Sequence, residues 1–267
     1  MPNLSGRGRP DDRAVDPRED VIVSALVLAA VFVGAVAQRV TGLGFALVVS
    51  PVLVILLGPF DGVLIVNLCG ALSAAIILAG VRRDVEWRRY LFLAIPALAG
   101  IVPGALLAYL LPDEALEIGI GLLLIAALTT SLVLRRTARA IDGPGVMAGF
   151  GFASGVMNAA AGIGGPSLSV YAVVSRWEQR AFAATLQPFF VTVGASSLLT
   201  KLLIAPERWP DLGTAAWVGI IVTMLAGIGA GTLLGPRIPT RAARAAVVVL
   251  AFGGAVSAIV KGISGLA

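Results

Sequence analysis

Residues 38–47 read Gln-Arg-Val-Thr-Gly-Leu-Gly-Phe-Ala-Leu, and Thr41-Gly42-Leu43-Gly44 within this stretch interrupts an apolar run that extends from Val21 to about Leu57. A helix that crosses the hydrocarbon core of a bilayer needs about 20 residues, so this run is too long for one straight crossing. A helix breaks at least cost at glycine, and Gly42 and Gly44 lie inside the interruption. The stretch therefore predicts two helices that meet at a break within the membrane.

The second half of the chain has a similar interruption, because Gly162-Ile163-Gly164-Gly165-Pro166 divides the apolar run 146–174. The part after this break, 165–174, is too short to cross a bilayer, which predicts two half-helices that meet near the middle of the membrane. Each interrupted run is followed by three apolar segments of membrane-crossing length. These segments are 63–81, 90–111 and 116–134 in the first half and 182–204, 215–235 and 245–263 in the second.

An overlay of the two halves indicates an internal duplication. At a shift of 120 residues the matches are Gly42 with Gly162, Gly44 with Gly164, Gln38 with Asn158, and Asn67 with Gln187. We therefore expect one membrane domain that consists of a first repeat over residues 21–140 and a second repeat over residues 141–267. A polar tail at residues 1–20 precedes them, and its composition predicts disorder.

The basic residues of the loops indicate how the repeats are oriented. Residues 82–89 hold four arginines and the corresponding loop 205–212 holds one, whereas 112–114 is acidic and its counterpart 237–244 holds three arginines. Short basic loops face the cytoplasm, so the repeats should be inverted, with both termini outside. The arginines within residues 7–18 oppose this placement of the N-terminus. The expected fold is an all-α integral membrane protein of two inverted repeats, each a broken or re-entrant helical hairpin plus three transmembrane helices.

The composition narrows the class of protein. Apolar residues make up 58% of the 267 residues and charged residues 13%, against about 45–50% and 25% in soluble domains. These values exclude a soluble enzyme and a nucleic-acid-binding protein, and basic cytoplasmic loops explain the net charge of +5. With no histidine and one cysteine, Cys69, the chain offers no metal site and gives no sign of another cofactor. It also lacks a convincing nucleophile–base pair, so no catalytic residue is assigned.

The two breaks point to an anion as the ligand. Unpaired N–H groups and the positive end of the helix dipole lie at a helix start and bind anions, and broken helices form the binding sites of secondary transporters. Amide and hydroxyl side chains nearby could add hydrogen bonds. The candidate substrate-binding residues are Gln38, Arg39, Thr41, Gly42, Gly44, Asn67, Asn158, Gly162, Gly164, Gly165, Ser167, Ser169 and Gln187. The alternative is that the amides only satisfy backbone groups freed at the breaks.

Arg39 is the charged residue among these candidates, and its counterpart in the second half is Ala159. A charge inside a membrane is costly and often functional. Arg39 therefore either supplies a fixed positive charge to the anion or reaches the membrane interface, if the helix before it crosses completely. No Asp or Glu lies deep in an apolar segment, which disfavours a cation as the substrate and proton coupling through a buried carboxylate.

The glycine motifs resemble those of a known family, the sulfite exporter TauE/SafE family, over residues 21–267. The stretches that carry the resemblance are 41–44 with Ser50-Pro51 in the first half, and 162–171, Arg180-Ala181 and 184–186 in the second. The resemblance implies a permease of the bacterial cytoplasmic membrane for small sulfur-containing or organic anions, such as sulfite or organosulfonates. Phe45-Ala46 and residues 67–69 depart from the family pattern, which leaves the identity of the anion open.

We therefore expect a secondary transporter that exports a small anion across the cytoplasmic membrane. The alternatives are an anion-conducting, channel-like pore and a membrane scaffold that transports nothing. The expected partners are the anion and the lipid bilayer, with no nucleic acid. The sequence leaves open whether the protein forms a homo-oligomer, and it does not identify a coupling ion.

Overall fold

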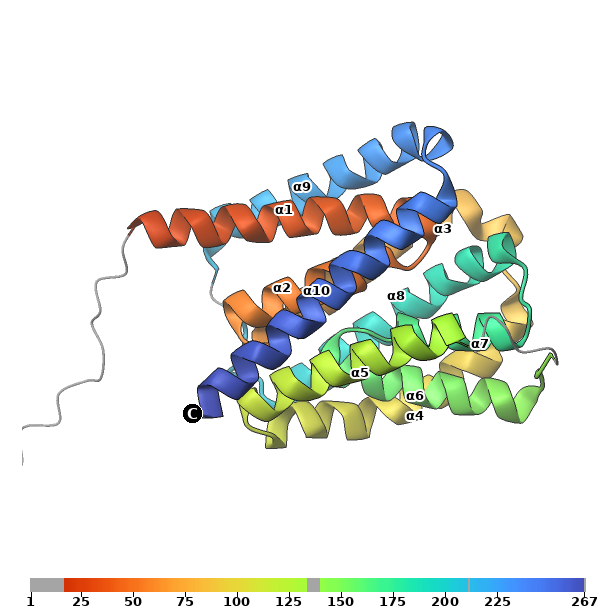
Figure 1. Cartoon of the computed structure of the whole chain (residues 1–267), viewed down its shortest axis with the longest axis horizontal. Coiled ribbons are helices and arrows are strands. Elements are labelled where there is room, and N and C mark those ends of the chain that lie inside the picture. Colours follow the sequence, from red (N-terminus) through yellow and green to blue (C-terminus); the bar gives the residue numbers. More distant parts are fainter. Residues whose placement is uncertain (1–16, 134–139, 211, 267) are drawn as a thin grey trace, which may run out of the picture.

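The computed structural model describes residues 17–133, 140–210 and 212–266, so residues 1–16 of the polar tail lie outside it. This described part forms ten α-helices and two 3-10 turns and contains no β-strand (Figure 1). The first half comprises α1 (Pro17–Thr41), α2 (Gly44–Leu57), α3 (Pro59–Val81), η1 (Arg82–Asp84), α4 (Trp87–Leu110) and α5 (Asp113–Val133). The second half comprises α6 (Pro144–Ala161), α7 (Gly165–Val174), α8 (Gln179–Ile204), α9 (Gly213–Leu234), η3 (Gly235–Arg237) and α10 (Thr240–Leu266).

Six of the described helices are long and apolar enough to cross a membrane, namely α1, α3, α4, α8, α9 and α10. Large apolar side chains on their outer faces are exposed, among them Leu110, Leu203 and Leu233. A contiguous apolar surface of this kind is unfavourable in water and is matched by lipid. The chain is therefore an all-α, multi-pass integral membrane protein, as its composition predicted.

Both helix breaks occur at the predicted glycines. Gly42, after α1, has a φ of +89°, and Gly162, after α6, has a φ of +72°, conformations that glycine adopts at no steric cost. The N–H of Gly42 donates to the carbonyl oxygen of Gln38, and that of Gly162 to the carbonyl oxygen of Asn158, both at 2.8 Å. The last turn before each break therefore carries an amide side chain. We call residues 42–43 the first break and residues 162–164 the second break.

Most helices begin two to five residues before the apolar segments that predicted them, and α1 and α6 illustrate the reason. α1 begins at Pro17, so residues 17–20 are helical and not part of a disordered tail, and α6 begins at Pro144 rather than Val146. Proline is favoured in the first helical turn, where a missing N–H has no consequence, and hydropathy does not register this preference. α1 thus has 25 residues and can cross the membrane alone, whereas α2 has 14 residues and α7 has 10.

Helices α1 and α2 form the first hairpin, and α6 and α7 form the second. Each hairpin packs against helices from the other half of the chain. α1 contacts α9 and α2 contacts α10, while α6 contacts α4 and α7 contacts α5. The helices that follow the hairpins, α3 and α8, contact each other. Helices α1 to α5 correspond in order to α6 to α10. When each helix in these contacts is replaced by its counterpart, the same contacts result. Because of this arrangement, both halves contribute to the interior of the bundle (Figure 1).

Glycines bring two of these helix pairs close together. A methyl group added at Gly100 of α4 would overlap the carbonyl oxygen of Phe152 on α6, and one added at Gly227 of α9 would lie 2.7 Å from the carbonyl oxygen of Phe32 on α1. Small residues permit this close approach of helix backbones in membranes. The longer helix of each hairpin, α1 or α6, is therefore held against a helix of the other half.

Candidate functional site

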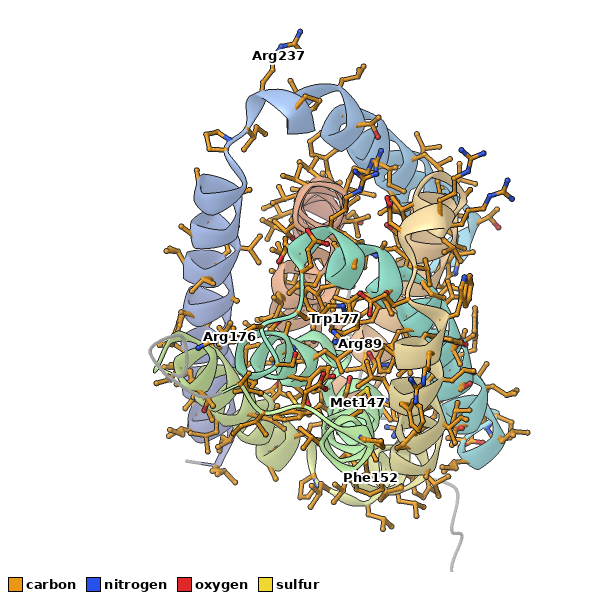
Figure 2. All side chains as sticks on the ribbon, turned by 90° about the vertical axis from the view of Figure 1, so that its right-hand side faces the viewer. Arg89, Met147, Phe152, Arg176, Trp177 and Arg237 are labelled. Carbon is orange, nitrogen blue, oxygen red and sulfur yellow. The ribbon has the colours of Figure 1, made fainter. Side chains whose placement is uncertain are left out.

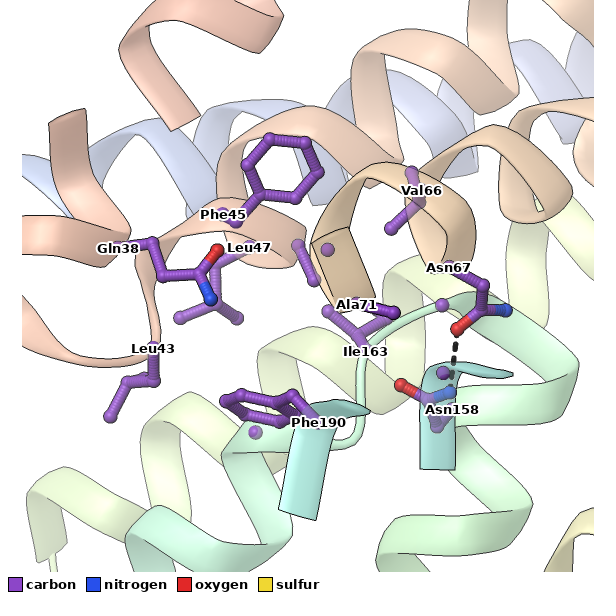
Figure 3. Close-up of a pocket in the computed structure, with 15 residues that line it drawn as sticks. Gln38, Leu43, Phe45, Leu47, Val66, Asn67, Ala71, Asn158, Ile163 and Phe190 are labelled. Carbon is purple, nitrogen blue, oxygen red and sulfur yellow. Dashed lines mark hydrogen bonds between the residues drawn. The ribbon is translucent and has the colours of Figure 1, made fainter. Parts of the chain in front are cut away.

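A small cavity lies between the two breaks, and we call it the central cavity (Figure 3). The ends of α1 and α6, the first turns of α2 and α7, and the helices α3 and α8 surround it. Its volume is about 30 Å³, which is room for about two water molecules. None of its lining side chains is charged. They are Gln38, Leu43, Phe45, Ala46, Leu47, Val66, Asn67, Gly70, Ala71, Asn158, Gly162, Ile163, Gly165, Phe190 and Gly194.

Asn158 and Asn67 form the tighter of two amide contacts at the cavity. Nδ2 of Asn158 donates to Oδ1 of Asn67 at 2.6 Å, drawn as the dashed line in Figure 3, and to Oγ of Ser197 at 3.1 Å. These bonds join α6 to α3 and α8. Nδ2 of Asn67 is buried and has no hydrogen-bond partner among the described residues. Since a buried donor without a partner costs about 1–3 kcal/mol, this group is available to an acceptor atom.

Gln38 and Gln187 form the second amide contact. Nε2 of Gln187 donates to the carbonyl oxygens of Ala183 at 2.8 Å and Gly42 at 3.1 Å. Both of its N–H bonds are used, so its Oε1 faces Nε2 of Gln38, at 3.4 Å. This leaves Oε1 of Gln38 buried without a partner among the described residues, and Figure 3 shows this amide directed toward the cavity. Two residues that line the cavity therefore carry an unpaired amide atom, an acceptor on Gln38 and a donor on Asn67.

The starts of α2 and α7 supply backbone donors. Their N-cap residues, Leu43 and Gly164, provide no side-chain hydrogen bond to the first turn. The first N–H groups of a helix lack partners within it, and the helix dipole places a partial positive charge there. Residues 45–47 of α2 and Gly165 of α7 line the cavity. The starts of α2 and α7 therefore contribute positive partial charge to the cavity, the ends of α1 and α6 contribute negative partial charge, and no cationic side chain lines it.

The structure does not bring the three predicted hydroxyl groups to the central cavity. Those of Thr41 and Ser169 donate to carbonyl oxygens four residues earlier, at 2.8 and 3.0 Å, and that of Ser167 donates to the carbonyl oxygen of Phe150 at 2.8 Å. Thr41 and Ser169 line a neighbouring cavity of about 260 Å³. All three hydroxyl groups therefore hold the hairpins in shape in this conformation.

The predicted glycines divide into two groups. Gly162 and Gly165 line the central cavity, whereas Gly42, Gly44 and Gly164 do not. The second group allows close packing around the breaks. A methyl group added at Gly44, for example, would lie 2.6 Å from Cβ of Ala37 on the other arm of the hairpin.

Arg39 lies outside the central cavity. Its Nε donates to Oγ1 of Thr232 on α9 at 2.8 Å. Its side chain lines a separate cavity of about 310 Å³, together with Gln38, Asp84 and Arg180. Gln38 lines both cavities, so the charge that the sequence placed beside the first break is close to the central cavity but not part of its wall.

Two serines at the site were not predicted from the sequence. Ser197 accepts the second hydrogen bond of Asn158, and Oγ of Ser50 on α2 donates to the carbonyl oxygen of Ala161 at 2.6 Å, beside the second break. A serine in an apolar helix can equally bond to its own backbone. Hydropathy and spacing therefore give no signal that these two serines connect different helices.

Charged side chains within the bundle lie away from the central cavity. Nζ of Lys261 donates to Oε1 of Glu117 at 2.6 Å and to the carbonyl oxygen of Ile55 at 3.0 Å. Glu117, the second residue of the apolar segment 116–134, is buried, so the bundle does contain a buried carboxylate, contrary to the expectation from the sequence. Lys201 is fully buried, with Nζ 4.7 Å from the ring centre of Phe60. Among the described residues, no group of three or more His, Cys, Asp or Glu side chains could hold a metal ion.

Comparison with known proteins identifies the family. Neither a curated protein nor a solved structure gives a significant match to the chain. The family model described as sulfite exporter TauE/SafE matches residues 26–258, nearly the whole chain. This is a family of membrane permeases for sulfite and related anions rather than of enzymes. The chain therefore belongs to the sulfite exporter TauE/SafE family.

Proposed function

We propose that the protein is a secondary transporter that exports small sulfur-containing or organic anions, such as sulfite or organosulfonates, across the bacterial cytoplasmic membrane. The observation that carries this proposal is the meeting of two uncapped helix starts at a buried cavity with no charged side chain. The starts of α3, α4, α6 and α9 also lack a side-chain cap, but among the described helices only those of α2 and α7 meet at the central cavity. The start of α8 shows how a helix start is satisfied by a side chain. The start of that helix is capped by the Glu178 carboxylate, which accepts from the N–H groups of Arg180 and Ala181. The starts of α2 and α7 lack such a cap and can accept an external anion.

The amide groups add selectivity to this site. Nδ2 of Asn67 can donate to an oxygen atom of the anion, and Oε1 of Gln38 can accept from a hydroxyl group of the ligand or from water. A small oxyanion presents several acceptor oxygens to such donors, and its protonated form also carries an O–H group. These amides therefore favour an oxyanion over a halide ion, which has no donor.

The size of the central cavity supports a transport cycle rather than an open pore. A volume of about 30 Å³ is smaller than an oxyanion of four or more heavy atoms needs. Binding therefore requires the surrounding helices to separate. In our proposal residues 21–140 and 141–267 are inverted repeats, and movement of one against the other exposes the site to each side in turn.

We place the arginine-rich end of the bundle in the cytoplasm, following the positive-inside rule. Figure 2 looks onto this end, where Arg89, Arg176 and Arg237 are labelled. The start of α1 and the end of α10 lie at the opposite end (Figure 1), which we assign to the outside. Arg135, Arg136, Arg139 and residues 1–16 lie outside the described part of the chain.

The test introduces an internal anion at one of the helix starts. Leu43→Asp places a carboxylate at the uncapped start of α2, where it would compete with the substrate for the same N–H groups. The matched control is Leu212→Asp, because Leu212 is the uncapped N-cap residue of α9 and does not line the central cavity.

Both variants and the wild type are purified, screened for thermal stabilisation by sulfite, sulfate, thiosulfate, methanesulfonate and acetate, and reconstituted for flux assays. We expect at least one sulfur oxyanion to stabilise the wild type and to show saturable transport. Leu43→Asp should abolish both effects, and Leu212→Asp should retain them. Non-saturating flux would indicate a pore, and an absence of both binding and flux in the wild type would indicate a scaffold.

A further inference from the structure

Two cavities adjoin the central cavity, and they differ in charge. The first, of about 260 Å³, shares Leu43 and Leu47 with it, and none of its lining side chains is charged. The second, of about 310 Å³, shares Gln38 with it and is lined by Arg39, Arg180 and Asp84, among others. We call this second cavity the vestibule. An anion is attracted to the vestibule and gains no comparable charge interaction in the first cavity.

The two arginines of the vestibule have different partners. Nε of Arg180 forms an ion pair with Oδ2 of Asp84 at 2.9 Å, so its charge is compensated. Nε of Arg39 donates to the neutral hydroxyl group of Thr232, and among the described residues no carboxylate forms an ion pair with Arg39. The vestibule therefore has a net positive charge, and that charge is concentrated on Arg39.

We propose that the vestibule is a second anion site, in which the guanidinium group of Arg39 captures a small oxyanion before it enters the central cavity. The inference rests on the proposed transport function and deepens it, because it names the route to the site. A guanidinium group offers several donors in a planar fork that matches two oxygens of one anion. With Nε bonded to Thr232, the terminal nitrogens remain available for this contact.

The Gln38–Gln187 contact is the barrier between the two sites. Both side chains line the vestibule, and Gln38 also lines the central cavity. The contact joining them is 3.4 Å long, at the weak end for a hydrogen bond, while two further bonds hold Gln187 to its backbone partners. Rotation of Gln38 alone therefore breaks one weak bond and opens a connection between the vestibule and the central cavity.

A second site also reduces the free-energy cost of removing water from an anion that enters the central cavity. The central cavity has no charged side chain, so an anion that enters it directly from water loses its hydration and gains only backbone and amide donors. Pairing with Arg39 lets the anion lose its water in two steps. Attraction over this range weakens as the ionic strength rises, because the Debye length falls to about 8 Å at 0.15 M salt.

The test measures how fast sulfite binds and how tightly. Arg39→Gln removes the charge, Arg39→Lys keeps it, and Arg88→Gln removes a charge at the same end of the bundle from a residue that does not line the vestibule. Association and dissociation rate constants are measured by stopped-flow tryptophan fluorescence at low and high ionic strength. The equilibrium Kd is measured on the same samples.

For Arg39→Gln we expect both rate constants to fall at least tenfold, with Kd changed less than threefold and little remaining dependence on ionic strength. Arg39→Lys should recover most of both rates, and Arg88→Gln should match the wild type. A rise in Kd with an unchanged dissociation rate would overturn the proposal, since Arg39 would then act on the anion in the central cavity. Rates for Arg39→Gln equal to those for Arg88→Gln would also overturn it.

A further variant keeps the inference testable if Arg39→Gln does not fold. Arg180→Gln removes the compensated charge of the vestibule and should slow association by about two- to threefold at low ionic strength. No change in this rate would again contradict the second site. If the wild type neither binds nor transports any sulfur oxyanion, the proposed function fails. If the wild type binds sulfite and the vestibule variants bind it at the same rates, only this inference is refuted.

Discussion

The two helix breaks share a backbone conformation and differ in the side chains that hold them. At each break a glycine of positive φ donates to the carbonyl oxygen of an amide residue four places earlier. At the second break that residue, Asn158, makes two hydrogen bonds to other helices, at 2.6 and 3.1 Å. At the first break Gln38 makes one such bond, at 3.4 Å, and the backbone of Gly42 is held instead, by Gln187.

The comparison shows that corresponding positions in the two halves are held in different ways. The amide side chain is fixed at the second break, whereas at the first break the backbone is fixed and the amide side chain can move. At the second break the amide itself connects three helices. At the first break the connection between helices runs through the carbonyl oxygen of Gly42, so the amide of Gln38 can rotate without loosening the hairpin. We therefore infer that the second break is the fixed side of the site and that the side chain of Gln38 is its mobile element.

The largest expected effect compares the two glycines. Gly42→Ala would place Cβ 2.6 Å from Cβ of Ala183, whereas in Gly162→Ala the nearest atom is Cγ1 of Val66, at 3.1 Å. Positive φ costs about 1–2 kcal/mol for alanine at either position, and overpacking adds about 1–3 kcal/mol at Gly42. Thermal unfolding in detergent should therefore show the larger loss of stability for Gly42→Ala. Equal losses would contradict a first break held by close backbone contact with α8.

The next effect compares the two amides. Asn158→Leu removes two bonds between helices and leaves Asn67 without its donor, at a cost of about 2–3 kcal/mol. Gln38→Met removes one long bond and should cost less than about 1 kcal/mol. The unfolding temperature should therefore drop clearly only for Asn158→Leu. Gln38→Met should slow sulfite transport, because an apolar side chain then replaces the amide between the vestibule and the central cavity. A Gln38 variant as unstable as the Asn158 variant would show that both amides are anchors.

The smallest expected effect concerns the charges beside the first break. Asp84→Asn removes the partner of Arg180, an ion pair whose arginine side chain is 77% exposed. Such a pair contributes about 0.2–1 kcal/mol or less, so the unfolding temperature should hardly change. The additional uncompensated charge should lower the apparent KM for sulfite about two- to threefold at low ionic strength. An unchanged KM would show that Arg39 alone, and not Arg180, attracts the anion to the vestibule.

Sequence alone was sufficient for features that depend on local physics. Glycine at 42 and 162 predicts where the helices break because no other residue adopts those backbone angles as readily. The apolar composition predicts the membrane environment, and the spacing of the amides places one of them before each break. The inversion of the repeats and the orientation in the membrane stay predictions.

Contacts between helices could not be predicted in the same way. The overlay matches Gln38 with Asn158 and Asn67 with Gln187 as corresponding positions, and it does not say which of these residues touch. In space Gln38 contacts Gln187, and Asn158 contacts Asn67. The position of Arg39 was open between the site and the membrane interface, because hydropathy does not determine which way a residue faces at the end of a helix. Its contact with Thr232 depends on α9, which lies far along the chain.

The packing of α1 against α9 also has a consequence for synthesis of the protein. About 170 residues separate the end of α1 at Thr41 from the start of α9 at Gly213. At about 5–20 residues per second, the ribosome needs roughly 10–35 s to produce the segment between them. During most of this interval Arg39 has left the ribosome, but Thr232 does not yet exist. The nascent first helix therefore needs another environment for its charge, such as the lipid headgroups or the insertion machinery, until the ninth helix arrives.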